Sequence, residues 1–343
     1  MRVRDMGVTV GRMQPGPRNK ISDVPGVTVG HATIGDGDFK TGVTVVMPCQ
    51  DNPFYRKLTA AAHVLNGFGK TLGLMQIEEL GALETPIVLT NTLSVGAVHD
   101  GMVEYMLERC DGGFTSINPL VCECNDGYLN DIRRRLVNKQ HLFQAIQSAG
   151  CDFAEGDVGA GKGMSCHGLK GGIGSASRLV ELKDRPYTLG VLTLTNHGRL
   201  ADFQIGGVSV AEESRAEGPE RGSCIVVMAT DIPLTDRQLY RAVRRAGVGL
   251  IRLGSYIGHG SGEVMVGFST ANRLPHECAE DVLPLQALHE DRMDLVFRAV
   301  AEATEEAVLN AMTAAETVTG YQGHTRESLT GYLARRQGGT PFR

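Results

Sequence analysis

The chain contains no tryptophan, and aromatic residues make up only 5% of its 343 residues. It also has no uninterrupted apolar run of the ~18–20 residues that a membrane-spanning helix needs. Its first stretch, MRVRDMGVTVGRMQPGPRNK, contains neither an apolar core nor a cleavage site of small residues, so no secretory signal is indicated. The sequence therefore predicts a cytoplasmic protein without a membrane partner.

An excess of basic charge is also missing. Lysine and arginine number 34 against 39 aspartates and glutamates, which gives a formal net charge of −5. Proteins that bind the phosphate backbone of nucleic acids carry a basic face, whereas the basic groups here are short, as in Arg133-Arg134-Arg135. Nucleic acid is therefore not an expected partner.

Closely spaced metal ligands are scarce as well. The eight cysteines are dispersed, and only Cys122-x-Cys124 and Cys166-His167 bring such ligands close together in the sequence. Neither is followed by a second pair at the spacing of a zinc finger, and there is no HExxH motif. We therefore expect reduced thiols, no metal site and no cofactor.

Glycine, by contrast, is abundant, with 44 residues. The glycine-dense segment 155–174 contains GDVGAGKG at 156–163, which matches a phosphate-binding loop of the form GxxxxGK[ST] except at its last position. The hydroxyl that would hold Mg²⁺ is missing, and no apolar strand precedes the loop. The pattern favours backbone that approaches a ligand or another strand over nucleotide binding.

Short apolar runs and amphipathic stretches alternate along the chain. Runs of strand length occur at 41–48, 86–90, 116–121, 187–195, 205–210, 224–229 and 264–269, and helical periodicity occurs at 76–83, 97–109, 140–149, 234–247 and 292–315. A Pro-Gly turn at 25–26 predicts a short strand pair over 21–31. No linker rich in glycine, proline and serine divides these elements, so one domain over 1–343 is expected. Periodicity alone predicts a mixed α and β fold.

The only break in composition is the polar connector 211–221, which leads through Gly222-Ser223 into an apolar strand beginning at Cys224. If the Gly222–Ser223 bond were cut, Ser223 would carry both a hydroxyl nucleophile and a free α-amine. The reference pKa of an α-amine is about 7.7–8.0, so this amine could accept the hydroxyl proton, as in N-terminal nucleophile hydrolases. The alternative is an ordinary serine where a loop becomes a strand.

Polar residues beside three other strands are further candidates. Asn196 could donate its amide N–H to a developing oxyanion, although asparagine at a strand end commonly forms a turn. Ser261 and Glu263 could hydrogen-bond an attacking serine and its ammonium partner, or could belong only to a turn. Glu123 could bind a cationic amine or face solvent.

A series of motifs runs in order through nearly the whole chain. The motifs are DVPG at 23–26, GH at 30–31, TGVT at 41–44, NGFGK at 66–70, ETPIVLTNTLSVG at 84–96, NDGYLNDI at 125–132, GGIG at 171–174 and ATD at 229–231. Together they resemble the DmpA-type aminopeptidases (L-aminopeptidase D-amidase/esterase) and the β-peptidyl aminopeptidases of peptidase family S58. The segment after Ser223 also resembles the one after the nucleophilic threonine of ornithine acetyltransferases.

The resemblance implies an α+β fold, a four-layer α/β/β/α sandwich. It also implies a precursor that cleaves itself between Gly222 and Ser223. The two chains, 1–222 and 223–343, would stay packed together in a homo-oligomer, a tetramer of processed pairs. Ser223 would be the nucleophile, with its freed α-amine as the proton acceptor.

The same resemblance implies roles for other residues of the site. Ser261 and Glu263 fit the pair that orients the nucleophilic centre, and Asn196 fits the oxyanion donor. Tyr128 matches a tyrosine that lines the site, and Glu123 would bind the free amino group of the substrate. The expected enzyme is an aminopeptidase that acts on a short peptide, amide or ester with a free amino terminus.

Three alternatives stay open. The cut could fall at Gly260–Ser261, which would leave 83 residues after it (343 − 260). The enzyme could pass the acyl group to an amine, as an ornithine acetyltransferase does. The chain could also be an unprocessed binding protein that keeps the pocket without catalysis.

Overall fold

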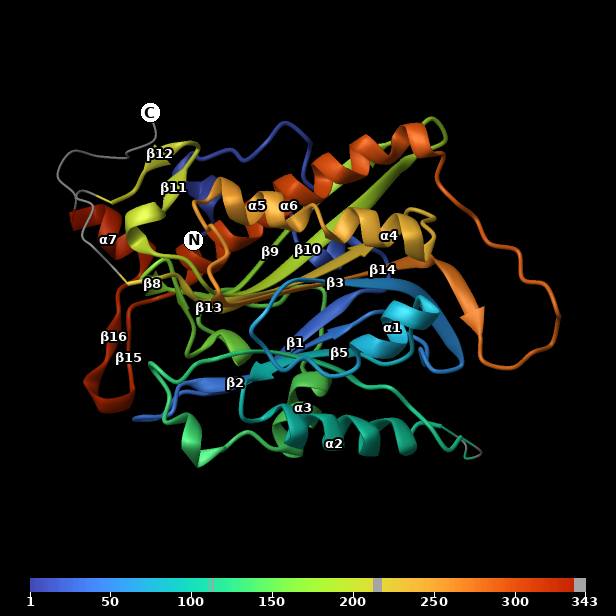
Figure 1. Cartoon of the computed structure of the whole chain (residues 1–343), viewed down its shortest axis with the longest axis horizontal. Helices are drawn as coiled ribbons and strands as arrows, with labels where there is room; N and C mark the ends of the chain where they lie inside the picture. The colour runs from blue at the N-terminus through green and yellow to red at the C-terminus, as the bar shows by residue number, and fades with distance from the viewer. Residues whose placement is uncertain (111, 113, 212–217, 336–343) are drawn as a thin grey trace.

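Two β-sheets lie face to face in the centre of the molecule, and helices cover the outer face of each sheet (Figure 1). This is the α+β four-layer sandwich implied by the resemblance, so that prediction is confirmed. The computed structural model describes residues 1–343 except 111, 113, 212–217 and 336–343. Within the described residues, no helix has the length and apolar character needed to cross a membrane.

The larger sheet has six strands in the order β4-β3-β14-β13-β10-β9. In that order their bounds are Ala82–Leu83, Arg56–Gly67, Gly260–Pro275, Arg221–Thr230, Pro186–Asn196 and Gly172–Glu181. Strands β13 and β14 are parallel, and the other neighbours in this sheet are antiparallel. Strand β13 therefore lies in the middle, between β14 and β10.

The smaller sheet has four strands in the order β1-β2-β5-β6. Their bounds are Thr28–Ile34, Thr41–Met47, Ile87–Asn91 and Leu120–Cys124. Strands β5 and β6 are parallel, whereas the other pairs are antiparallel. The last residues of β6 point toward the end of the larger sheet where β13 begins, since Cys124 contacts both Leu194 and Ser223.

Helices α2 (Val95–Leu107) and α3 (Lys139–Gln147) cover the smaller sheet, and α4 (Asp236–Val243), α5 (Ala246–Arg252) and α6 (Met293–Ala314) cover the larger one (Figure 1). On β13, Ile225 and Val227 belong to the core between the sheets, while Cys224 and Val226 pack toward the helices. Both faces of this strand are buried, which explains its continuous apolar run.

Shorter elements complete the fold. The helices are α1 (Leu74–Leu80) and α7 (Leu329–Arg335), and the two-residue strands are β7 (Ser165–Cys166), β8 (Leu169–Lys170), β11 (Gln204–Ile205), β12 (Val208–Ser209), β15 (Val318–Thr319) and β16 (Thr325–Arg326). Turns of 3₁₀-helix are formed by Val3–Met6, Ile21–Asp23, Ile132–Arg134, Gly159–Gly161, Leu200–Asp202, Glu290–Arg292 and Tyr321–Gly323.

Most predicted strands and helices are present, but the strand predicted over 116–121 is β6 at Leu120–Cys124, and three other elements also differ. The predicted helix 234–247 is divided into α4 and α5, and the turn between them lets Gly249 of α5 pack directly against the backbone of α6. The predicted strand 205–210 is a hairpin, because Gly206 and Gly207 both have positive φ angles. The predicted strand pair over 21–31 is a 3₁₀ turn followed by β1, since the Ile21 N–H bonds the Ser175 hydroxyl.

Close packing accounts for glycines in the segment 155–174. A Cβ at Gly161 would lie 2.6 Å from the Ile173 nitrogen, and one at Gly163 would lie 2.0 Å from the Lys40 carbonyl oxygen. Lys162, the lysine of the GxxxxGK pattern, forms an ion pair with Asp157 at 2.7 Å. The sequence analysis expected these glycines to approach either a ligand or another strand. The structure shows that they approach another strand.

Candidate active site

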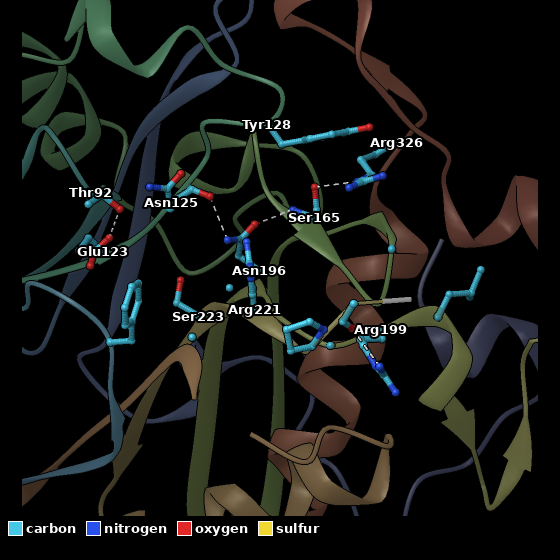
Figure 2. Close-up of a pocket in the computed structure, with 18 of the residues that line it drawn as sticks. Thr92, Glu123, Asn125, Tyr128, Ser165, Asn196, Arg199, Arg221, Ser223 and Arg326 are labelled. Atoms are coloured by element: carbon cyan, nitrogen blue, oxygen red, sulfur yellow. Dashed lines mark hydrogen bonds between the residues drawn. The ribbon is translucent and has the colours of Figure 1, made fainter. Parts of the chain in front are cut away.

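A cavity of about 840 Å³ opens where β13 begins and β10 ends (Figure 2). Five of the seven residues predicted for the site line it, namely Glu123, Tyr128, Asn196, Gly222 and Ser223. Residues that the sequence analysis gave no role also line it, among them Phe68, Lys70, Thr92, Asn125, Ser165, Arg199, Arg221 and Arg326. The fold thus brings together segments that are far apart in the sequence.

Ser223 is the third residue of β13, which begins at Arg221 and so starts three residues before the predicted strand. Ser223 pairs with Asn196 of β10 and with Gly262 of β14. Because side chains alternate along a strand, Ser223 lies on the same face as Ile225, the face toward the smaller sheet. It lines the cavity and is only 4% exposed.

The thiol of Cys124, at the end of β6, hydrogen-bonds with the Ser223 side chain. Burial raises the pKa of this thiol well above its ordinary value, and the contact with Ser223 opposes that rise only in part. Cys124 is therefore a neutral neighbour of the Ser223 hydroxyl and not a base for it.

Gly222 has a backbone conformation that other residues avoid. Its φ angle is +130°, and a Cβ at this position would lie 1.8 Å from the carbonyl oxygen of Asn196. Any larger residue would have to push β10 away from β13. The residue before Ser223 thus has a backbone conformation and a close contact with β10 that glycine alone accommodates without strain.

The side-chain amide of Asn196 is fixed through both of its polar atoms. Its Oδ1 accepts a hydrogen bond from the Ser165 backbone N–H at 2.9 Å, and its Nδ2 donates to the Asn125 carbonyl oxygen at 2.9 Å (Figure 2). An amide nitrogen has two hydrogens, so one remains to donate to an oxygen in the cavity. The turn residue that the sequence analysis considered as an alternative is in fact the last residue of β10.

Tyr128 belongs to a layered group at the rim of the cavity. Its ring stacks on the ring of His324 at a centroid distance of 4.5 Å. The guanidinium of Arg326 also contacts the Tyr128 ring and lies 3.8 Å from its centre. The Nε of Arg326 donates to the Ser165 hydroxyl at 3.1 Å. The β15–β16 hairpin thereby connects to the residue that orients Asn196.

Glu123 is almost fully buried, at 4% exposed, in β6. One carboxylate oxygen accepts the Lys70 backbone N–H at 2.9 Å, and the other accepts the Thr92 hydroxyl. The alternative that Glu123 faces solvent is therefore excluded. Each carboxylate oxygen has a further lone pair for a cation in the cavity.

Ser261 and Glu263 do not line the cavity. In the register of β13 and β14, Gly222 pairs with Ser261 and Cys224 pairs with Glu263, so both side chains lie on the helix face of the larger sheet. The Ser261 hydroxyl donates to Oε1 of Glu263, and both residues are completely buried. Residues two apart in a strand lie on the same face of the sheet, but this spacing alone does not tell which face Ser261 and Glu263 occupy.

The environment of Glu263 favours its protonated form. Burial raises the pKa of its carboxyl to about 7, the hydrogen bond from Ser261 opposes this rise, and the nearby Glu220 carboxylate adds to it. Its Oε2 has no hydrogen-bond partner among the described residues. Glu263 is thus a buried acid beside the start of β13 without a cation to neutralise it.

Four basic residues line the cavity, namely Lys70, Arg199, Arg221 and Arg326, and Glu123 is the acidic residue among those that line it. Glu123 lies on one side of Ser223, and Arg199 and Arg326 lie on the other (Figure 2). A ligand with a positive end and a polar or negative end would therefore have one preferred orientation. The arginines were missed in the sequence because each lies in a separate turn or short strand, without a shared motif.

Comparisons with known proteins agree along nearly the whole chain. The family model described as peptidase family S58 matches residues 19–326. The chain is 37% identical over 357 aligned positions to the β-peptidyl aminopeptidase BapA of Sphingosinicella microcystinivorans, an alignment that covers 96% of this chain and 89% of that protein.

Solved structures are similar as well. A β-aminopeptidase from a Burkholderia species has a TM-score of 0.91 and 39% identity, with coverage of 97% of this chain and 96% of that one. The L-aminopeptidase D-Ala-esterase/amidase of Ochrobactrum anthropi, described as a variant of the Ntn hydrolase fold, has a TM-score of 0.89 and 35% identity, with coverage of 96% and 95%.

Proposed function

The chain belongs to peptidase family S58, and from this membership we propose that it is a self-processing serine aminopeptidase and amidase with Ser223 as its nucleophile. The family and the aminopeptidase activity predicted from the sequence are confirmed. The nucleophile and its partners are proposals. The observation that carries them is Ser223 at the cavity wall, directly after Gly222, where only glycine fits, and opposite Asn196.

Self-cleavage would begin at the Gly222–Ser223 bond. The Ser223 Oγ attacks the Gly222 carbonyl carbon, the C–N bond breaks, and the Oγ proton passes to the nitrogen, which leaves as the α-amine of Ser223. Water then hydrolyses the resulting ester, giving a carboxylate on Gly222 and a free hydroxyl on Ser223. The products are the chains 1–222 and 223–343.

Turnover would use the same serine. The freed α-amine takes the Oγ proton as Oγ attacks the carbonyl of the first residue of the substrate, and then returns it to the leaving amine. Asn196 donates its remaining Nδ2 hydrogen to the oxyanion. Water releases the acyl group and restores Ser223.

Ser261 and Glu263 would act on the α-amine from the opposite face of the sheet. Gly222 pairs with Ser261, so the nitrogen of Ser223, which is bonded to Gly222 before the cut, lies beside this pair. Once protonated, the amine would supply the cation that the buried Glu263 carboxyl lacks. The two residues are thus positioning residues for the base.

The substrate would lie across the cavity with its amino group at Glu123. The two hydrogen bonds on the Glu123 carboxylate fix it before a ligand arrives, so a substrate ammonium meets a preorganised acceptor. The leaving part would point toward Arg199 and Arg326, with Tyr128 along the wall. This arrangement suits a short peptide, amide or ester with a free amino terminus. A cytoplasmic tetramer of processed pairs stays a prediction.

Intact mass under denaturing conditions tests the proposal, followed by N-terminal sequencing of any smaller chain. Two chains, the smaller beginning Ser223-Cys224-Ile225, would support it, and hydrolysis of L-amino acid and β-amino acid amides would then be measured. A smaller chain beginning at Ser261 would move the nucleophile to that residue. A single uncut chain that hydrolyses neither amide would contradict the proposal.

A further inference from the structure

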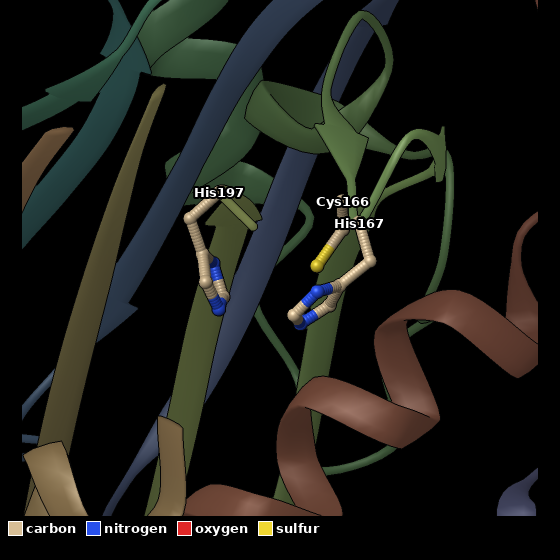
Figure 3. A group of neighbouring side chains, drawn as sticks. All are labelled: Cys166, His167 and His197. Carbon is tan, nitrogen blue, oxygen red and sulfur yellow. The ribbon is translucent and has the colours of Figure 1, made fainter. Parts of the chain in front are cut away.

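Three side chains of metal-ligating type meet in the protein interior (Figure 3), next to Gly168 and Gly198, which line the active-site cavity. Cys166 ends β7, His167 follows it in the turn to β8, and His197 follows Asn196 at the end of β10. One ligand atom from each residue lies within 4.8 Å of the others, and all three residues are at most 1% exposed. The sequence analysis expected no metal here because His197 is remote from the Cys166-His167 pair in the chain.

The hydrogen bonds at this cluster leave lone pairs on both rings. His167 Nδ1 lies 3.3 Å from the Arg199 carbonyl oxygen, a contact that places the proton on Nδ1 and a lone pair on Nε2. Nε2 of His167 and both ring nitrogens of His197 have no hydrogen-bond partner among the described residues. Buried polar nitrogens rarely lack partners, so these atoms point to a missing one.

The backbone is shaped to bring the rings together. His167 has a φ angle of +47°, which is unusual for a residue with a side chain. A Cβ at Gly198 would lie 2.3 Å from His167 Nδ1, so the ring occupies space that only glycine leaves open. On its other side the ring stacks on Phe203 at a centroid distance of 4.4 Å. The segments that contain Gly198 and Phe203 therefore hold the His167 ring between them.

The surroundings also suit a thiolate bound to a cation. The Thr195 hydroxyl and the His197 backbone N–H both donate hydrogen bonds to the Cys166 sulfur. Such donors to sulfur commonly support a metal-bound thiolate. Two buried groups act electrostatically on Cys166, the Lys170 amine and the Glu220 carboxylate, and Glu220 forms no ion pair with the described residues. It would offset the positive charge of a bound ion.

We propose that Cys166, His167 and His197 form a binding site for a thiophilic cation, with Zn²⁺ as the occupant. The ligands are the thiolate and one nitrogen from each neutral imidazole, a set that zinc accepts with a water in the fourth position. On binding, the Cys166 thiol releases its proton to solvent as the Zn–S bond forms. The ligand atoms lie within 4.8 Å of one another, so the side chains would move closer together around the ion.

The site adjoins the catalytic residues but takes no part in the chemistry. Gly168 and Gly198, each next to a ligand, line the cavity. His197 directly follows Asn196, and its Cα would lie 3.2 Å from a Cβ at Gly222. The ion would therefore brace the backbone beneath both the oxyanion donor and the scissile bond.

Titration of the metal-free full-length chain with Co²⁺ under reducing conditions tests the site. We expect a thiolate-to-cobalt charge-transfer band and the visible bands of tetrahedral cobalt, which saturate at one ion per chain and disappear when Zn²⁺ is added. Cys166→Ser should abolish the charge-transfer band and weaken binding by more than ~100-fold, the upper end of the loss caused by removing a supporting group. Cys278→Ser, at an exposed cysteine, is the matched control and should bind normally.

Absence of the charge-transfer band in the wild-type chain, or its persistence in Cys166→Ser, would overturn the proposal. Circular dichroism of the metal-free variants checks that they are folded, and His197→Gln provides a second variant with a buried polar side chain, which should also lose tetrahedral cobalt. The titration is repeated in Ser223→Ala. Binding there is expected whether or not the chain processes itself, which separates this inference from the proposed function.

Discussion

The two faces of the larger sheet differ sharply at the end where β13 begins. On the face toward the smaller sheet, Asn196 and Glu123 border an open cavity, and hydrogen bonds occupy both polar atoms of each side chain. On the helix face, Glu263 and His197 are sealed from solvent, and each keeps polar atoms without a partner in the described part of the chain. The open face is organised before any ligand arrives, whereas Glu263 and His197 on the sealed face keep buried polar atoms unpaired among the described residues.

This difference suggests that the two faces of the sheet have different roles. Preorganised donors and acceptors are what a site needs to stabilise charge that develops during a reaction. Unpaired buried acceptors instead favour the arrival of a cation, either the ammonium freed at Ser223 or a metal ion at Cys166. Changes on the open face should therefore alter turnover, and changes on the sealed face should alter pH dependence, stability or metal binding.

Removing the nucleophile should have the largest effect on the open face. Ser223→Ala is expected to remain a single uncut chain and to lose at least ~10⁴-fold in kcat/KM, as enzymes do when a catalytic nucleophile is deleted. Intact mass and an amide-hydrolysis assay measure both outcomes. Cleavage or near-normal activity in this variant would move the nucleophile elsewhere, and Ser261→Ala would be examined next.

Loss of the oxyanion donor should have the next largest effect. Asn196→Ala should reduce kcat by about 10²–10³-fold with little change in KM, because the amide acts mainly on the charge of the transition state. The matched control is Ser165→Ala, which keeps the backbone N–H that orients Asn196 and should cost much less. Equal losses in the two variants would indicate disturbed structure and not a lost donor.

Neutralising the amino-group acceptor should weaken substrate binding. Glu123→Gln preserves the shape of the side chain but removes its charge, and a hydrogen bond to a charged group contributes about 1.5–3 kcal/mol. We therefore expect kcat/KM to fall by roughly 10–100-fold, mainly through KM. Steady-state kinetics on an amide with a free amine, compared with an ester that lacks the amine, would show whether the loss is confined to the ammonium.

The smallest effect is expected from a substitution on the sealed face, which should change how the stability of the uncut chain depends on pH. Because the pKa of Glu263 is raised to about 7 from an ordinary 4.5, the folded chain keeps a proton that the unfolded chain has released. Its contribution to the free energy of unfolding therefore falls as pH rises through this range. In the Ser223→Ala background, Glu263→Gln should remove a decrease of about 2–3 kcal/mol between pH 5 and pH 8. Urea unfolding at the two pH values measures this decrease. If the free energy of unfolding changed equally with pH in Ser223→Ala and in the double variant, the raised pKa would be contradicted.

Local patterns in the sequence predicted much of the fold. Apolar runs such as 224–229 and 264–269 have the length and continuity of strands buried on both faces, and both became strands of the larger sheet. Strand β9 (Gly172–Glu181) was not predicted, because its first residues are small and its apolar side chains few. Its helix-facing glycine, Gly174, instead allows close approach of α6, a requirement that only the assembled structure reveals.

The site was predictable only where neighbouring residues carried the signal. Gly222-Ser223 and Ser261-x-Glu263 could be singled out from their spacing beside strands, with the family resemblance assigning roles. Arg326 reaches the cavity through a hairpin near the end of the chain, and no local pattern connects it with Ser165. Pairing between distant strands also decides that Glu263 lies on the opposite face from Ser223.

The strand order of the larger sheet has a consequence for how the protein refolds after it has unfolded. Strands β13 and β14 come after Ser223 in the chain for almost all of their length, yet they lie between β3 and β10, which come before it. An uncut chain can assemble this sheet in a unimolecular reaction whose rate does not depend on protein concentration. After a cut at Gly222, two separate polypeptides would have to collide first, so recovery would become second order and slow on dilution. Processing would thus convert a protein that can refold alone into one that persists because it rarely unfolds.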